Sequence, residues 1–187
     1  MKKILLTTMV LASLTACKKE TKTENTGLEN QDSLDISEIS EPEISSAKFA
    51  VFSPQQATDF LKKQNNDTIY VTNFFATWCR PCVHEIPYFK EKMTEMKDQP
   101  VKFTFISIDE KVDWETEVRD FSAKHGISEN TVLMDMQLLT PDFFTTNFKT
   151  WTGEYIPFTI IRKGDKTEEI SGGISKEELA EKIKSVL

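Results

Sequence analysis

The sequence is poor in cysteine and histidine, and both shortages exclude classes of protein. Three cysteines among 187 residues are too few for a disulfide framework or for a four-thiolate zinc site. Basic residues are also in the minority, with Lys+Arg 23 against Asp+Glu 30 and a formal net charge of −7. An acidic chain is a poor partner for nucleic acid. The three cysteines therefore point to a redox pair, to lipid attachment or to buried thiols.

The first residues have the organisation of a secretory signal peptide. A basic start precedes an apolar run from Ile4 to Leu14, which is too short to span a membrane. The run ends Leu14-Thr15-Ala16-Cys17, which resembles a bacterial lipobox and implies cleavage before Cys17 and lipidation of its thiol. We expect residues 1–16 to be a lipoprotein signal peptide. The alternative is a secreted protein with a stray thiol at Cys17.

Residues 17–46 have the composition of a charged spacer. They hold three lysines, eight acidic residues and no aromatic residue, a net charge of −5. Such a segment has too little apolar surface to form a core, so we expect a flexible, lipidated tether. A partner contact through its few scattered isoleucines and leucines is the alternative. The folded domain is expected over residues 47–187.

From Ala47 onward, apolar strands alternate with amphipathic helices, which is typical of an α/β domain. The strand over 68–76 is apolar on both faces, so we expect it at the centre of the sheet. Further strands are expected at 48–52, 101–108, 131–134, 155–162 and 166–170, and helices after Ser53, over 81–97, over 113–125 and after Ser175.

The reactive chemistry is concentrated in Trp78-Cys79-Arg80-Pro81-Cys82, where the central strand ends and a helix begins. A thiol at a helix N-terminus faces unpaired backbone N–H groups and the positive end of the dipole, which favours the thiolate. Two intervening residues allow the second sulfur to close onto the first, and Pro81 suits the first helical turn. We expect an exposed, nucleophilic Cys79 and a buried resolving Cys82.

A zinc site or a pair of inert thiols is the alternative for this motif. The chain has no second CxxC, and its remaining cysteine is assigned to the lipid. His84 and His125 are separated by a predicted helix and strand, so a tetrahedral metal site lacks ligands. We expect no metal and no cofactor, with His84 facing solvent and His125 at a helix end.

One stretch resembles the TlpA/ResA-type branch of the thioredoxin family. It reads Asn73-Phe-Phe-Ala-Thr-Trp-Cys-Arg-Pro-Cys82, followed by Glu85-Ile86-Pro87 and later by Tyr155-Ile156-Pro157. Thioredoxins proper place an aspartate at the position of Asn73, whereas this branch carries a glutamate three residues after the second cysteine. The resemblance covers about residues 47–187. It implies a thioredoxin-like α/β fold, with a central mixed β-sheet flanked by helices on both faces.

The resemblance also implies roles for individual residues. The Glu85 carboxyl lies beneath the disulfide with a raised pKa and exchanges a proton with Cys82; the alternative is a surface glutamate. Pro157 matches the family's cis-proline, which presents the backbone of Ile156 to an extended substrate and keeps metals from the two thiols.

The remaining motif residues tune the redox couple. Trp78 shields the disulfide and frames the contact surface, or is simply a buried tryptophan. Arg80, next to Pro81, stabilises the Cys79 thiolate, which makes the couple more oxidising. The segment Leu138–Glu154 matches no family pattern, and is either a substrate-binding rim or extra core.

Together these features predict an exported, membrane-anchored thiol–disulfide oxidoreductase. Its expected partners are disulfide-containing cell-envelope proteins such as apocytochromes, a membrane-embedded electron donor, and the inner or outer membrane itself through the lipid. Lys18, in place of an aspartate, favours the outer membrane. Four alternatives stay open: a disulfide oxidase or isomerase, a lipid-anchored metallochaperone, a binding module whose disulfide is structural, and a peroxidase of the related peroxiredoxin branch.

Overall fold

A six-stranded mixed sheet forms the centre of the domain in the computed structural model, which describes residues 48–187. The strand order is β1-β4-β3-β2-β5-β6. The first four strands in this order pair in parallel, and β5 and β6 are antiparallel. Their bounds are β1 (Ala50–Phe52), β2 (Ile69–Phe75), β3 (Val101–Ser107), β4 (Thr131–Met134), β5 (Phe158–Lys163) and β6 (Lys166–Ser171).

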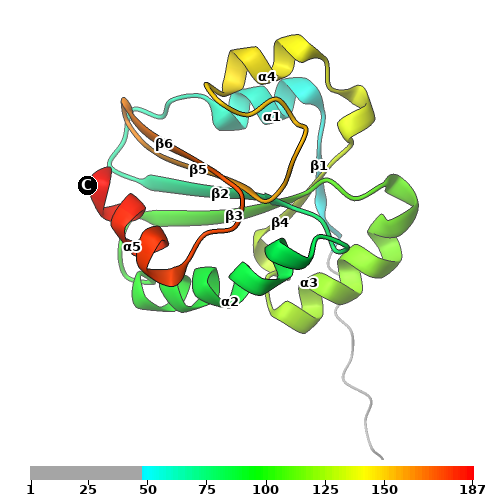
Figure 1. Ribbon diagram of the computed structural model, residues 1–187, viewed down its shortest axis with the longest axis horizontal. Coiled ribbons are helices and arrows are strands. Elements are labelled where there is room, and N and C mark those ends of the chain that lie inside the picture. Colours follow the sequence, from blue (N-terminus) through cyan, green and yellow to red (C-terminus); the bar gives the residue numbers. More distant parts are fainter. Residues whose placement is uncertain (1–47) are drawn as a thin grey trace, which may run out of the picture. The chain divides into compact units, whose positions relative to one another are not determined.

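Helices cover both faces of the sheet, as predicted. Figure 1 shows α1 and α4 on one face and α2, α3 and α5 on the other. A separate apolar cluster is buried under each layer, one against α2 and α5 and one against α1 and α4. The bounds are α1 (Pro54–Leu61), α2 (Arg80–Glu95), α3 (Arg119–His125), α4 (Pro141–Asn147) and α5 (Lys176–Ser185).

Strand β2 is central, as its apolar residues predicted. Every residue from Val71 to Phe75 is buried. The strand pairs with β3 on one side and with β5 on the other, so that Asn73 lies opposite Phe105 and Thr159. The chain passes from the end of β2 directly into α2. This connection is therefore bordered by residues from both neighbouring strands.

Two predicted boundaries are wrong. The helix expected over 113–125 is a 3₁₀ turn (Lys111–Asp113), a π-helical turn (Trp114–Val118) and only then α3. Trp114 Nε1 donates a 2.9 Å hydrogen bond to the Asp109 carbonyl, five residues earlier, where this irregular region begins. Strand β5 begins at Phe158 because the preceding Pro157 has no N–H for the ladder.

Part of the segment Leu138–Glu154 adds to the core, while Leu138 is exposed and other residues line a surface hollow. Phe143, Phe148 and Trp151 are buried, and the Trp151 ring stacks on Phe158 with centroids 4.7 Å apart. The segment is also attached to the edge strand β6. There the Glu169 carboxylate accepts hydrogen bonds of 2.8–3.0 Å from the backbone N–H groups of residues 149 and 150 and from the hydroxyl of residue 150.

The predicted signal peptide (1–16), the tether (17–46) and the lipidation site Cys17 lie outside the described residues. Within 48–187, no helix is both long enough and apolar enough to cross a membrane.

Candidate active site

Cys79 and Cys82 form a disulfide at the N-terminus of α2, with their Cα atoms 5.2 Å apart. Cys79 is the N-cap of the helix, and its Sγ accepts a 3.3 Å hydrogen bond from the Cys82 backbone N–H. Pro81 lies in the first turn, where a missing N–H leaves no bond unmade. The placement of the cysteine pair at a strand-to-helix connection is as predicted.

Cys79 is not exposed, contrary to the sequence-based expectation. Only 4% of its surface is accessible to solvent, and Cys82 is fully buried. In the oxidised form, the Cys79 sulfur is bonded to Cys82 and packs in the apolar cluster that also contains Phe75 and Ala76. A sequence pattern identifies the helix end, but it does not reveal this packing.

The two residues beside Cys79 are at the surface. Trp78 is 66% exposed, so it is not a buried core tryptophan. Arg80 is the first residue of α2 and is also exposed. An aromatic ring and a guanidinium are thus available to an approaching molecule on either side of Cys79.

Glu85 lies one turn after Cys82 on α2, and only 1% of it is exposed. This excludes the alternative of a surface glutamate. Its Oε1 accepts a 2.7 Å hydrogen bond from Asn73 Nδ2, and its Oε2 accepts a 2.9 Å bond from the Ile174 backbone N–H. Burial raises the pKa of Glu85 to about 7, and the two hydrogen bonds offset only part of that rise. The carboxyl group can therefore exchange a proton near neutral pH.

Asn73 connects Glu85 to the sheet. Its Nδ2 also donates a 3.0 Å bond to Thr159 Oγ1 on β5, while its buried Oδ1 has no hydrogen-bond partner among the described residues. Sequence reasoning used Asn73 only to distinguish the branch of the family. Its contact with Glu85 depends on a pairing across 12 positions of sequence, which a motif does not encode.

The peptide bond between Ile156 and Pro157 is cis, as the resemblance implied. Ile156 packs against the apolar cluster that contains both cysteines. Two hydrogen bonds hold the surrounding backbone: Gly172 N donates to the Pro157 carbonyl (2.9 Å), and Trp151 Nε1 donates to the Tyr155 carbonyl (2.8 Å). The segment leading into β5 is thus fixed beside the disulfide.

Sequence reasoning missed a second buried carboxyl group, that of Asp109. This residue follows β3 and is 1% exposed. Its two oxygens accept hydrogen bonds from the Thr77 backbone N–H (3.0 and 3.1 Å), and its Oδ1 accepts a 2.6 Å bond from the Thr77 hydroxyl. The sequence did offer a signal. It was an acidic residue directly after an apolar strand, beside the strand that leads into the cysteine motif.

The two histidines lie where they were predicted. His84 is exposed on α2 beside Tyr88, and His125 is the last residue of α3. Across residues 48–187, no group of three or more His, Cys, Asp or Glu side chains is arranged to hold a metal ion.

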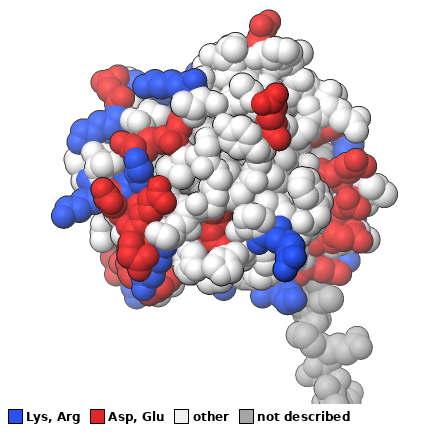
Figure 2. All heavy atoms as spheres, in the orientation of Figure 1, with Lys and Arg blue, Asp and Glu red and all other residues white. Residues whose placement is uncertain are grey.

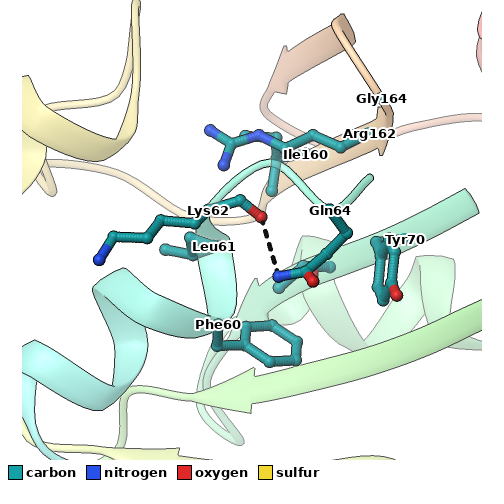
Figure 3. Close-up of a pocket in the computed structure, with 9 residues that line it drawn as sticks. Phe60, Leu61, Lys62, Gln64, Tyr70, Ile160, Arg162 and Gly164 are labelled. Carbon is teal, nitrogen blue, oxygen red and sulfur yellow. Dashed lines mark hydrogen bonds between the residues drawn. The ribbon is translucent and has the colours of Figure 1, made fainter. Parts of the chain in front are cut away.

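The hollows of the domain differ in size and chemistry. A hollow of about 320 Å³ borders Glu85, between α2 and Gly173. One of about 510 Å³ is lined by residues 139–152, including Phe144 and Trp151. A third, shown in Figure 3, lies between the end of α1 and strands β2 and β5, with Arg162 beside it. At about 10 Å³, it has room for roughly one water molecule.

The fold and the cysteine pair together define a thioredoxin-like domain with a CxxC redox motif. The profile of the AhpC/TSA family matches residues 46–164, and the chain belongs to that family. A thiol-disulfide oxidoreductase ResA of Bacillus thuringiensis subsp. konkukian is 28% identical over 116 residues, which are 61% of each chain. A ResA of Geobacillus kaustophilus is 25% identical over 114 residues. The chain thus spans about 61% of the length of the curated relatives it matches.

Solved structures agree on the fold. A thiol:disulfide interchange protein of the thioredoxin family from Chlorobium tepidum superposes with a TM-score of 0.54 at 24% identity, covering 69% of this chain and 83% of that one. A DsbF homologue from Corynebacterium diphtheriae gives a TM-score of 0.51 at 18% identity, covering 64% and 73%. The predicted resemblance to TlpA/ResA-like proteins and the thioredoxin-like fold are confirmed.

Proposed function

We propose that this protein is an exported, membrane-anchored thiol–disulfide oxidoreductase that reduces disulfides in cell-envelope proteins. The observation that carries the proposal is the Cys79–Cys82 disulfide at the start of α2 with the Glu85 carboxyl buried one turn later. The activity named for the ResA relatives is consistent with it.

The reaction begins from the dithiol form. The Cys79 thiolate attacks one sulfur of the substrate disulfide, and the other substrate sulfur leaves as a thiolate that takes up a proton. Cys82 then attacks Cys79 Sγ, which breaks the mixed disulfide and releases the second substrate thiol. Two electrons pass from the protein to the substrate, and the Cys79–Cys82 disulfide is the oxidised product.

Glu85 acts as the proton acceptor for the second step. Cys82 must lose its proton to attack, and its side chain is fully buried, away from bulk water. A carboxyl group with a pKa of about 7, one helical turn away, can accept this proton at neutral pH and return it when the pair is reduced again.

The surface around the disulfide suits a protein substrate. Trp78 and Tyr155 are exposed, and Ile156 beside the cysteine cluster is partly exposed. In Figure 2, charged side chains gather along two flanks of this face, whereas the surface over α4 and the segment leading into β5 carries few. An uncharged, extended substrate segment could lie along Ile156 with its disulfide at Cys79.

The N-terminal residues support a location at the envelope membrane. A lipid on Cys17 would hold the domain at the envelope membrane, and residues 18–46 would span the distance to its targets. Because the substrate reaction oxidises the pair, a membrane-embedded donor must return two electrons after each turnover. The periplasm-facing leaflet of the inner or the outer membrane would fit this arrangement.

A disulfide oxidase or isomerase is the second candidate, and Arg80 favours it. A guanidinium beside Cys79 stabilises the thiolate and therefore the reduced form, which makes the couple more oxidising. The exposed position of Arg80 weakens this effect, because water and salt screen surface charges.

Insulin reduction in the presence of dithiothreitol tests the proposed activity. We expect the protein to accelerate precipitation of the insulin B chain and Cys79→Ser to abolish that acceleration. A structural disulfide would not accelerate it, so equal rates with and without the protein would reject the proposal. Stoichiometric copper binding by the reduced domain would instead favour a metallochaperone.

A further inference from the structure

Asp109 is a buried carboxyl group that the reaction described above does not use. It is held from three directions. Its oxygens accept bonds from Thr77 in the connection between β2 and α2, its Oδ2 accepts a 2.9 Å bond from Ser107 Oγ at the end of β3, and its carbonyl accepts from Trp114 Nε1. The position of the carboxylate is therefore fixed.

The carboxylate lies close to the attacking cysteine. Thr77, which it contacts at 2.6–3.1 Å, is two residues before Cys79. Two residues of chain span at most about 7 Å, so the charge lies within roughly 10 Å of the Cys79 backbone. Asp109 and Cys79 are both almost fully buried, and water therefore screens their interaction weakly.

The charge of Asp109 is not balanced by a neighbouring cation. None of the ion pairs formed within residues 48–187 includes it. The groups that approach its oxygens are a backbone N–H and two hydroxyls, which carry no net charge. Arg80, the cation next to Cys79, is exposed and therefore more strongly screened than the buried carboxylate.

We propose that Asp109 is a positioning residue that sets the redox potential of the couple through Cys79. Its fixed negative charge disfavours the Cys79 thiolate, and thereby the reduced form, so the pair is a stronger reductant than its CxxC sequence alone implies. It opposes Arg80 from inside the protein, and the buried charge has the larger effect. This inference rests on the proposed function in one respect, which is that Cys79 carries the thiolate.

The test is the equilibrium with glutathione, in which the protein disulfide and two glutathione thiols interconvert with the protein dithiol and one glutathione disulfide. Asp109→Asn removes the charge and keeps the size of the side chain. We expect the equilibrium constant to move about tenfold toward the dithiol, as a unit charge at this separation predicts. This corresponds to a potential about 30 mV higher.

Two matched variants separate charge from geometry. Thr77→Val and Ser107→Ala each remove one hydrogen bond to the carboxylate but retain its charge. We expect both to leave the equilibrium constant unchanged. If either moved it tenfold, the effect would belong to the shape of the turn, and the charge argument would be overturned. If Asp109→Asn does not fold, Asp109→Ser, which also removes the charge, is measured in its place, and an unchanged equilibrium constant in that folded variant would overturn the inference.

Failure of this inference is distinguishable from failure of the proposed function. An unchanged equilibrium constant in folded Asp109→Asn, with insulin reduction still dependent on Cys79, would overturn only the role of Asp109. Insulin reduction that persists in Cys79→Ser would overturn the proposed function itself. A shift toward the disulfide in Asp109→Asn has the wrong sign and would also reject the inference.

Discussion

The side-chain amide of Asn73 donates a 2.7 Å hydrogen bond to Glu85 Oε1, and so joins the central strand β2 to α2 one turn after the second cysteine. The same amide nitrogen contacts Thr159 on β5. Glu85 on α2 is therefore held by β2 directly and by β5 through Asn73, and its other oxygen is held by the Ile174 backbone N–H. A carboxyl group fixed in this way can act repeatedly on the same thiol.

The first prediction concerns the covalent intermediate. Cys82→Ser removes the resolving thiol, so attack by Cys79 should stop at the mixed disulfide and trap partners. Mass spectrometry of the trapped adducts, formed with cell-envelope extract, would identify them. Cys79→Ser is the matched control and should trap nothing. If Cys82→Ser yields no adducts, substrate reduction through Cys79 is contradicted.

The second prediction concerns proton transfer by Glu85. Glu85→Gln keeps the size of the side chain but cannot accept a proton. We therefore expect disulfide exchange to slow by about 100-fold at neutral pH. The pH dependence of Cys82 alkylation should also shift. Glu91→Gln, at an exposed glutamate on the same helix that pairs with Lys176, is the control. Identical alkylation profiles in wild type and Glu85→Gln would reduce Glu85 to a structural role.

The third prediction concerns stability and pH. Burial raises the pKa of Glu85 from an ordinary value of 4.5 to about 7, so the folded state binds a proton that the unfolded state releases between these values. The stabilisation is complete below about pH 4.5 and is lost as the pH rises through 7, a change of ~3 kcal/mol in the free energy of unfolding. Urea unfolding of the oxidised protein between pH 4.5 and 8 measures it. Glu85→Gln should flatten the dependence of the unfolding free energy on pH. If the dependence stayed the same in this variant, other groups would be its cause.

The sequence predicted those parts of the fold that depend on local pattern. The apolar residues of β2 placed it at the centre, and the position of Cys79-Arg80-Pro81-Cys82 after that strand placed the pair at a helix start. The C-cap of α3, Gly126, adopts the left-handed conformation (φ 63°) that glycine commonly takes just after a helix. Each of these features involves residues that are adjacent or one turn apart.

The parts that could not be predicted depend on contacts between distant residues. Asp109 reaches Thr77 across 32 positions, and its burial follows from the pairing of β2 with β3. Cys79 was expected at the surface because its sequence position defines a helix end and not the packing around its sulfur. Neither the Asp109–Thr77 hydrogen bonds nor the packing around the Cys79 sulfur leaves a periodic pattern in the sequence.

The fourth prediction concerns the redox state in cells. A reductant must be kept reduced, so alkylation of intact cells should find the Cys79–Cys82 pair largely as the dithiol. Deleting the electron donor should convert it to the disulfide. A pair that is fully oxidised in wild-type cells, with no donor able to reduce it, would reject the reductant assignment and favour an oxidase or isomerase.

The fifth prediction concerns the membrane anchor. If Cys17 is lipidated, Cys17→Ser should release the protein from the membrane fraction and abolish incorporation of labelled palmitate. The redox activity of the released protein toward insulin should be retained, because the domain over residues 48–187 contains both thiols. Membrane association that survives the substitution would contradict lipid anchoring.

The Glu169 carboxylate secures the chain just after α4 to strand β6, so the segment that carries α4 is attached to the edge of the sheet at its C-terminal end. Because this attachment does not depend on α4 itself, the helix could be exchanged. A helix of different length or surface could replace α4 while Trp151, stacked on Phe158, continued to hold the approach to Pro157. Related proteins with the same redox centre could in this way diverge in the partners they accept, with the electron-transfer chemistry left intact.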